Sequence, residues 1–251
     1  NECRAERKQH DRIKDDEDSE ADCELIDSEG DLDLDAARNK KKIEVLEAYD
    51  ILDTVKHFEK NFYEEHPDIT ATPQKLIDEF RAKEHIKIKG RSQVRPILSF
   101  GYLGFSEQLL DLISRNNFEK PTPIQAEALP AALSGRDVVG IAKTGSGKTL
   151  AYVWPMLIHI LDQRELDRNE GPIGLVLGQR DNLQQIYIET KKYCKKFNIS
   201  IGCLLGGENK HEQWKTLKAG IDILIASPGR LIEMIRKKAT NLQRVTYLVI
   251  D

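Results

Sequence analysis

The most informative stretch of the sequence is Val138-Val139-Gly140-Ile141-Ala142-Lys143-Thr144-Gly145-Ser146-Gly147-Lys148-Thr149, which is followed by Leu150 to Leu161. Its apolar first part predicts a buried strand, and the segment after it has helical periodicity. Gly145 and Gly147 allow the backbone to curl, so that N–H groups of the loop and of the helix start face phosphate oxygens. Lys148 would reach the outer phosphates, and the Thr149 hydroxyl would bind Mg²⁺. A strand before and a helix after favour a phosphate-binding loop over a plain glycine turn.

The same alternation of apolar runs and helix-length segments continues after Phe100. Strands are predicted at Val138 to Ala142, Ile173 to Leu177, Ile199 to Leu205, Asp222 to Ala226 and Val245 to Ile250. Repeated strand–helix units give right-handed crossovers, and therefore an α/β fold whose parallel sheet carries helices on both faces. Ligands of such sheets bind at the carboxyl ends of the strands, where the chemistry is expected.

A carboxylate stands at the end of the last apolar run. Asp251 directly follows Val245 to Ile250, and an acidic residue in that place commonly holds the Mg²⁺ of a bound nucleotide. The alternative is an ordinary charged residue that begins a loop. The phosphate-binding loop elsewhere in the chain favours the metal role.

Charge is distributed unevenly along the 251 residues. Residues 1 to 35 carry about 15 acidic and about 5 basic side chains, roughly −10, so the remainder carries roughly +6 of the net charge of −4. Residues 1 to 39 are expected to be a disordered acidic tail because they offer too little apolar surface to bury. The basic remainder suits a polyanionic partner, although lysines scattered for solubility would give the same sum.

Other classes of protein are disfavoured by cysteine spacing and hydropathy. The four cysteines, Cys3, Cys23, Cys194 and Cys203, form no Cys-x-x-Cys pair, which argues against a zinc site or a disulfide framework. The longest apolar stretch, residues 150 to 161, is shorter than the roughly 20 residues of a membrane span. The acidic N-terminus is unlike a signal peptide, so we expect no membrane association.

Residues 40 to 97 are expected to form an extension that braces the main domain, residues 98 to 251. Thr72-Pro73 predicts a helix start with proline at the first helical position, followed by Leu76, Ile77 and Phe80 on one face. Residues 85 to 89 alternate between polar and apolar side chains, as an edge strand does.

A family resemblance rests on Phe118-Glu119-Lys120-Pro121-Thr122-Pro123-Ile124-Gln125, with Phe100 upstream. This segment resembles the Q motif of DEAD-box RNA helicases, and residues 142 to 149 match that family's Ala-x-Thr-Gly-x-Gly-Lys-Thr loop. The resemblance implies a RecA-like lobe that binds ATP and Mg²⁺. It implies that Phe118 stacks on adenine, that Gln125 hydrogen-bonds the base edge, and that Lys120 and Phe100 shape the pocket. An amide carries a donor and an acceptor together, as that reading requires.

Further matches lie after the later predicted strands. Gly206-Gly207 resembles the family's double-glycine RNA contact, and Ser227-Pro228-Gly229-Arg230 resembles its Thr-Pro-Gly-Arg motif. By this resemblance Gly206, Gly207, Ser227, Gly229 and Arg230 contact RNA, with Arg230 adding a charge-assisted bond. A plain turn at Gly206-Gly207 and an ordinary N-cap at Ser227 remain alternatives.

One motif departs from the family pattern. Where the family has Pro-Thr-Arg-Glu-Leu, this chain reads Gly178-Gln179-Arg180-Asp181-Asn182 and is one residue shorter. Arg180 and Asp181 are expected to replace the Arg-Glu pair, and the proline and the hydroxyl that would supply one RNA contact are absent.

The resemblance is closest to splicing-associated members, with a p68-type extension at Phe58 to Pro67. It implies a nuclear location, with a cytoplasmic one as the alternative, and ribonucleoprotein or splicing partners for residues 1 to 97. It implies a monomeric ATP-dependent RNA helicase whose remaining motifs and second lobe lie beyond Asp251. Residues 1 to 251 by themselves are then expected to bind nucleotide and barely hydrolyse it. Two alternatives stay open: a catalytically incompetent binding module on a ribonucleoprotein, and a P-loop ATPase acting on DNA or protein.

Overall fold

The computed structural model describes residues 57–90, 94–167 and 170–251. The chain divides into two units, Asn1–Ala48 and Tyr49–Asp251, and all described residues belong to the second. The predicted acidic tail, with Cys3 and Cys23, lies outside the described residues. Among those described, no helix is long and apolar enough to cross a membrane, and no cluster of His, Cys, Asp and Glu is suited to hold a metal ion.

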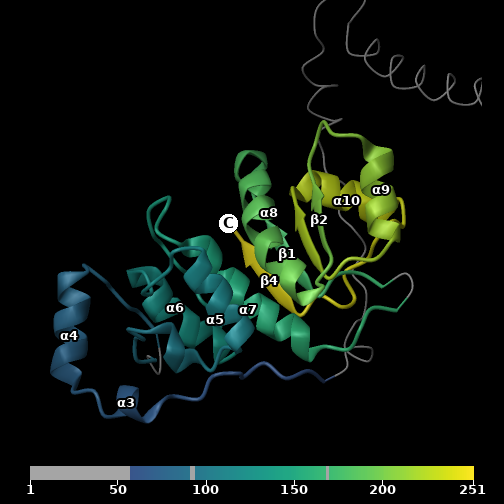
Figure 1. Ribbon diagram of the computed structural model, residues 1–251. Helices are drawn as coiled ribbons and strands as arrows, with labels where there is room; N and C mark the ends of the chain where they lie inside the picture. Colours follow the sequence, from purple (N-terminus) through teal and green to yellow (C-terminus); the bar gives the residue numbers. More distant parts are fainter. Residues whose placement is uncertain (1–56, 91–93, 168–169) are drawn as a thin grey trace, which may run out of the picture. The chain divides into compact units, whose positions relative to one another are not determined.

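A four-stranded parallel sheet, in the order β2-β3-β1-β4, forms the centre of this unit (Figure 1). Its strands are β1 (Gly174–Leu177), β2 (Ile201–Leu204), β3 (Ile223–Ala226) and β4 (Tyr247–Ile250). The helices are α3 (Pro67–Thr70), α4 (Gln74–Lys83), α5 (Glu107–Arg115), α6 (Pro123–Leu133), α7 (Lys148–Asp162), α8 (Arg180–Cys194), α9 (Lys210–Lys218) and α10 (Pro228–Arg236), with short 3₁₀ turns at Phe100–Leu103 and Lys195–Phe197. The predicted α/β class is confirmed, as are four of the five predicted strands.

Helices cover both faces of the sheet because successive strand residues point to opposite sides. On one face Val176, Ile223 and Ile225 pack in a core that includes residues of α7 and α8. On the other face Leu175, Leu204, Leu224 and Ala226 pack with α9 and α10 through Leu217, Leu231 and Met234. These strands are apolar on both sides, as expected for a parallel sheet that is covered twice.

The strand predicted at Val138 to Ala142 is not formed. Residues 136–143 have no regular secondary structure and pair with no strand among the described residues. Val139 is 92% exposed and Ile141 is 94% exposed. A strand needs a neighbouring backbone about 4.8 Å away, and the described chain does not supply one here. β4 is an edge strand of the sheet, and one of its faces is uncovered, since Leu248 is 55% exposed and Ile250 80%. The apolar run alone could not reveal this missing partner.

Two predictions for residues 72 to 89 were also wrong in detail. Pro73 is the N-cap of α4 rather than its first residue. Ile77 is buried, whereas Leu76 is 55% exposed, because adjacent helical positions point about 100° apart. Residues 86–89 form no strand, and the left-handed backbone of His85 (φ 56°) ends the regular pattern.

The segment before the Q-motif-like residues contacts the α6–α7 pair at several points. The amide of Phe62 donates to the Leu133 carbonyl at 2.7 Å. Arg81 of α4 forms a two-bond ion pair with Glu127 of α6, through Nε–Oε1 at 2.8 Å and Nη2–Oε2 at 3.1 Å. The rings of Phe58 and Phe62 meet the edge of buried His159. Hydrogen bonds, one ion pair and aromatic contacts thus join residues 57–97 to the helices that carry the site.

Candidate nucleotide and RNA site

The predicted phosphate-binding loop lies at the start of α7. Gly147 is the N-cap of this helix and adopts a left-handed conformation (φ 89°). The amides of the first helical turn, beginning with Lys148 and Thr149, have no intrahelical acceptor and form the positive end of the helix dipole. The local sequence produces this start because glycine adopts the turn at no steric cost.

Gln125 supports this loop from α6. Its side-chain Oε1 accepts a hydrogen bond from the backbone amide of Thr122 at 3.1 Å, and its backbone amide donates to Thr122 Oγ1 at 3.4 Å. Its side-chain Nε2 donates to the Gly147 carbonyl at 3.2 Å. The side chain is fully buried, and the Thr122 pair forms a capping box. Both ends of the Gln125 amide are therefore engaged within the protein, so the predicted adenine contact stays a prediction.

The loop residues fit a bound phosphate group and metal ion. Ser146 Oγ is buried and has no hydrogen-bond partner. A Cβ on Gly147 would lie 2.6 Å from Gln125 Nε2, so only glycine fits there. Lys148 forms no ion pair within the described part of the chain, and Ala142, Lys143, Thr144 and Gly145 complete the loop with exposed or half-buried side chains. The orphaned hydroxyl, the free helix amides and the unpaired ammonium together suit a polyphosphate.

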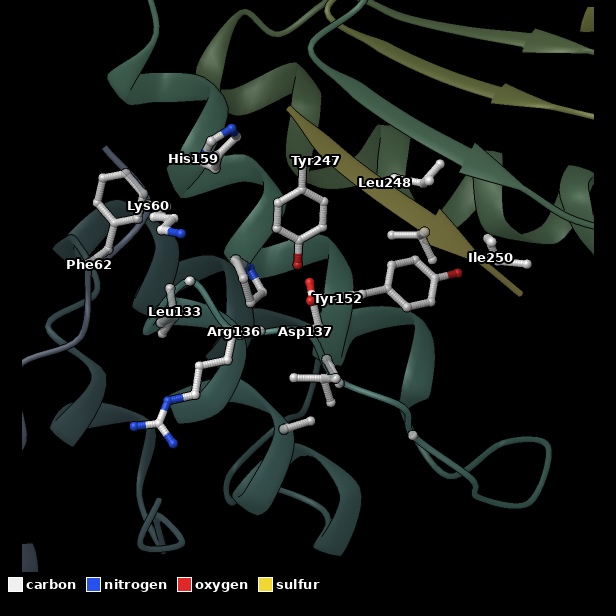
Figure 2. Close-up of a pocket in the computed structure, with 18 of the residues that line it drawn as sticks. Lys60, Phe62, Leu133, Arg136, Asp137, Tyr152, His159, Tyr247, Leu248 and Ile250 are labelled. Carbon is white, nitrogen blue, oxygen red and sulfur yellow. The ribbon is translucent and has the colours of Figure 1, made fainter. Parts of the chain in front are cut away.

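A cavity of about 440 Å³ connects Lys148 of the loop with Asp251 at the end of β4. It opens between residues 135–140, α7 and β4, and Figure 2 shows the side chains of Asp137 and Tyr247 pointing toward one another and that of Tyr152 pointing toward Ile250. The Asp251 amide donates to the Leu177 carbonyl at 2.9 Å, which fixes its backbone beside β1. The two residues predicted to meet the outer phosphates and Mg²⁺ thus line one space.

The Asp251 carboxylate accepts a hydrogen bond from Tyr152 Oη at 3.0 Å. Burial raises the pKa of Tyr152 well above its usual range, and the Asp251 carboxylate raises it further. The hydroxyl therefore stays protonated near neutral pH. Sequence reasoning missed Tyr152, and the only available signal was its position one helical turn after Thr149.

The residues predicted to hold adenine lie in different surroundings. Phe100 is 5% exposed and packs edge-on against Trp154 with ring centroids 5.3 Å apart. Phe118 is partly buried and meets the same indole at 5.8 Å, while Lys120 is exposed. Phe100 is thus a core residue behind the site, and its contribution to the pocket would be indirect.

The residues predicted to contact RNA gather at the carboxyl ends of β1, β2 and β3. Arg180 begins α8 and is exposed, and its Nη2 lies 3.2 Å from the Cβ position of Gly207. Gly206 and Gly207 follow β2, and Gly207 has a left-handed backbone conformation (φ 82°) that favours glycine. Ser227 is the N-cap of α10, and its side chain makes no capping bond. Gly229 lies in the first turn of α10 with open space around it.

Arg230 is engaged inside the protein rather than free for a ligand. It is 7% exposed. Its Nη1 donates to Gln213 Oε1 at 3.0 Å and to the Glu208 carbonyl at 3.3 Å, and its Nε pairs with Glu233 at 3.1 Å. These bonds tie α10 to α9 and to the loop that follows Gly207. The structure supports a positioning role, and direct RNA contact by Arg230 stays a prediction.

Replacing Arg230 is expected to destabilise the chain without any RNA. Arg230→Ala would leave Gln213 with an unpaired buried oxygen, although Glu233 keeps Lys210 and Lys237. We expect a loss of about 2 kcal/mol of unfolding free energy in urea denaturation, below the range for a fully broken buried pair. Arg180→Ala is the matched control and should change stability by less than about 0.5 kcal/mol. Equal stability of the two variants would contradict the positioning role.

A glycine-rich loop with a lysine at the start of a helix, together with an acidic residue at the end of a parallel strand, is the arrangement of P-loop nucleotide-binding proteins. The family is more specific. The DEAD/DEAH box helicase family model matches residues 122–251, and the chain belongs to this family.

Relatives and solved structures agree with this assignment. The chain is 51% identical over 196 residues to the human ATP-dependent RNA helicase DDX42, covering 77% of this chain and 21% of that protein. It is 46% identical over 216 residues to DEAD-box ATP-dependent RNA helicase 24 of rice (Oryza sativa subsp. japonica), covering 85% and 28%. The yeast splicing factor Prp28 superimposes with a TM-score of 0.67 at 30% identity, over 72% of this chain and 44% of that one. Prp28 of Chaetomium thermophilum bound to ADP gives the same TM-score at 32% identity, over 78% and 46%. The chain thus spans about a fifth to a quarter of the length of the curated relatives it matches.

Proposed function

We propose that this chain is the ATP-binding lobe of an ATP-dependent RNA helicase. The observation that carries this function is the cavity that Lys148 and Asp251 both line at the start of α7. Lys148 and the α7 amides would bind the β- and γ-phosphates, and Thr149 with Asp251 would hold Mg²⁺. When bound, Mg²⁺ would neutralise the charge that develops on the phosphates.

RNA would bind at the carboxyl ends of β1 to β3. Arg180 is the exposed cation there, and Gly206, Gly207, Ser227 and Gly229 present backbone close to the surface. Backbone N–H groups and arginine contact phosphates without reading sequence. Arg230 would act by holding this surface in place. Contacts of this kind would bind the RNA backbone. They would fix the position of the RNA on the protein without selecting its base sequence.

The wider role is proposed from the relatives. A splicing factor among the similar structures supports a nuclear location and splicing partners, which would bind through residues 1–97. We also propose the division into residues 1–39, 40–97 and 98–251, because Phe62, Arg81 and Ile97 all bond to α6. One observation favours the alternative of a binding module without catalysis: α8 begins at Arg180 with neither the proline nor the hydroxyl of the family motif.

Nucleotide titration tests the function directly. Fluorescent ADP and fluorescent GDP are titrated in Mg²⁺ into the chain and into Lys148→Ala, after circular dichroism has shown that each is folded. We expect ADP to bind more tightly than GDP, and Lys148→Ala to weaken both at least about tenfold, since the positive charge that meets the phosphates is lost. If the folded chain binds neither nucleotide, or binds both alike, the adenine site is wrong and the binding module takes its place.

Gln125→Ala in the same titration separates two roles of this residue. If Gln125 reads adenine, the preference for ADP over GDP disappears. If it only supports the loop through Gly147, both affinities fall by the same factor and the preference remains.

A further inference from the structure

We propose that Tyr152 is a positioning residue that orients the Asp251 carboxylate toward the magnesium ion of the bound nucleotide. This role rests on the proposed function. It concerns a side chain of α7 that belongs to none of the sequence motifs that carry the family resemblance.

The α7 helix places Tyr152 one turn after Thr149 and in contact with Asp251, the two residues predicted to bind the metal ion. Tyr152 follows Thr149 by three positions, so both lie on the same face of the helix one turn apart. Tyr152 Oη donates to Asp251 Oδ2 at 3.0 Å across 99 residues of sequence. The phenol of α7 thus reaches Asp251 directly, and Figure 2 shows it projecting toward the end of β4 beside Ile250.

The phenol is the donor in its bond to the carboxylate. An ionised carboxylate can only accept, so the 3.0 Å bond places the proton on Tyr152 Oη. A protonated phenol cannot compete with Asp251 as an anionic ligand, and it can only hold the carboxylate in place.

Asp251 needs such an external constraint. The residue is exposed at the end of β4, and Tyr152 provides the only hydrogen bond to its carboxylate within the described residues. Since this bond uses Oδ2, Oδ1 remains available to the metal ion or to water bound to it. Groups that orient a metal-binding side chain typically contribute about 10- to 100-fold in metal affinity.

The test uses Tyr152→Phe, which removes only the hydroxyl. The affinity of the full 251-residue chain for fluorescent ADP is measured as Mg²⁺ is titrated, with EDTA as the metal-free reference. We expect the Mg²⁺ concentration for half-maximal tightening to rise roughly tenfold. Affinity in EDTA should stay unchanged, because the hydroxyl donates to Asp251, whose proposed role requires the metal ion.

Two controls make this result specific. Tyr187→Phe on α8 removes a phenol hydroxyl that accepts from Lys191 at 3.2 Å, and it should leave the Mg²⁺ midpoint unchanged. In an Asp251→Ala background, Tyr152→Phe should have no further effect on the midpoint, because the side chain that accepts its hydrogen bond is absent.

Three outcomes would overturn the role of Tyr152. They are an unchanged Mg²⁺ midpoint, an equal loss of affinity with and without Mg²⁺, and an additive effect in the Asp251→Ala background. The second outcome would mean that Tyr152 serves only the fold. If the unmodified chain binds no nucleotide at all, the proposed function itself fails, which distinguishes the two failures.

Discussion

Gly147→Ala is expected to reduce ADP affinity by at least about tenfold and to lower the unfolding free energy by roughly 3 kcal/mol. Two effects add. A left-handed backbone (φ 89°) is costly for any residue with a Cβ, at about 1 to 2 kcal/mol. The new Cβ would also lie 2.6 Å from Gln125 Nε2, whose side chain is buried and bonded at both ends. The loop must shift, and its amides then no longer face the phosphates.

Gly145→Ala is the matched control for this experiment. Its backbone is also left-handed (φ 76°), but no atom lies within 4 Å of the Cβ position. In urea denaturation, Gly145→Ala should lose only the unfolding free energy that the left-handed backbone costs, about 1 to 2 kcal/mol. Gly147→Ala should also cost less in a Gln125→Ala background, since the obstructing amide is absent. Equal losses of stability in the two glycine variants would show that the contact with Gln125 is unimportant.

Trp154→Ala is expected to destabilise the chain by about 3 to 5 kcal/mol, the usual range for removal of a large buried aromatic side chain. Trp154 is fully buried. Its indole contacts four aromatic rings edge-on, those of Phe100, Phe105, Phe118 and Tyr193, with centroids 5.3 to 6.5 Å apart. These rings come from the segment before α6 and from α8, so the indole joins α7 to both. Its removal leaves a cavity that the surrounding rings cannot close without moving.

The second tryptophan provides the control. Trp214 on α9 is 38% exposed, and it contacts His211 and Lys218. Trp214→Ala should cost about 1 kcal/mol or less. Urea denaturation followed by circular dichroism gives both values. A Trp154→Ala variant as stable as Trp214→Ala would contradict the view that the aromatic cluster joins α7 to its neighbours.

Local sequence patterns were sufficient for much of the fold. The helix at 148–162, the loop before it and four parallel strands were predicted because apolar periodicity and glycine turns depend on residues close together in the chain. The strand predicted at residues 138–142 was wrong because pairing depends on residues far away in the sequence. A strand exists only if another backbone pairs with it, and an apolar run does not show whether one is present.

The candidate site also has features that local sequence predicts and features that only the tertiary structure shows. The sequence by itself predicted a glycine-rich loop at the start of a helix, because the conformational freedom of glycine acts in the local backbone. Only the tertiary structure revealed that Gln125 bonds Gly147, that Arg230 is buried among Gln213 and Glu233, and that Tyr152 meets Asp251. Each depends on where separate helices and strands come together, since side chains far apart in sequence become neighbours only when packing brings their elements into contact.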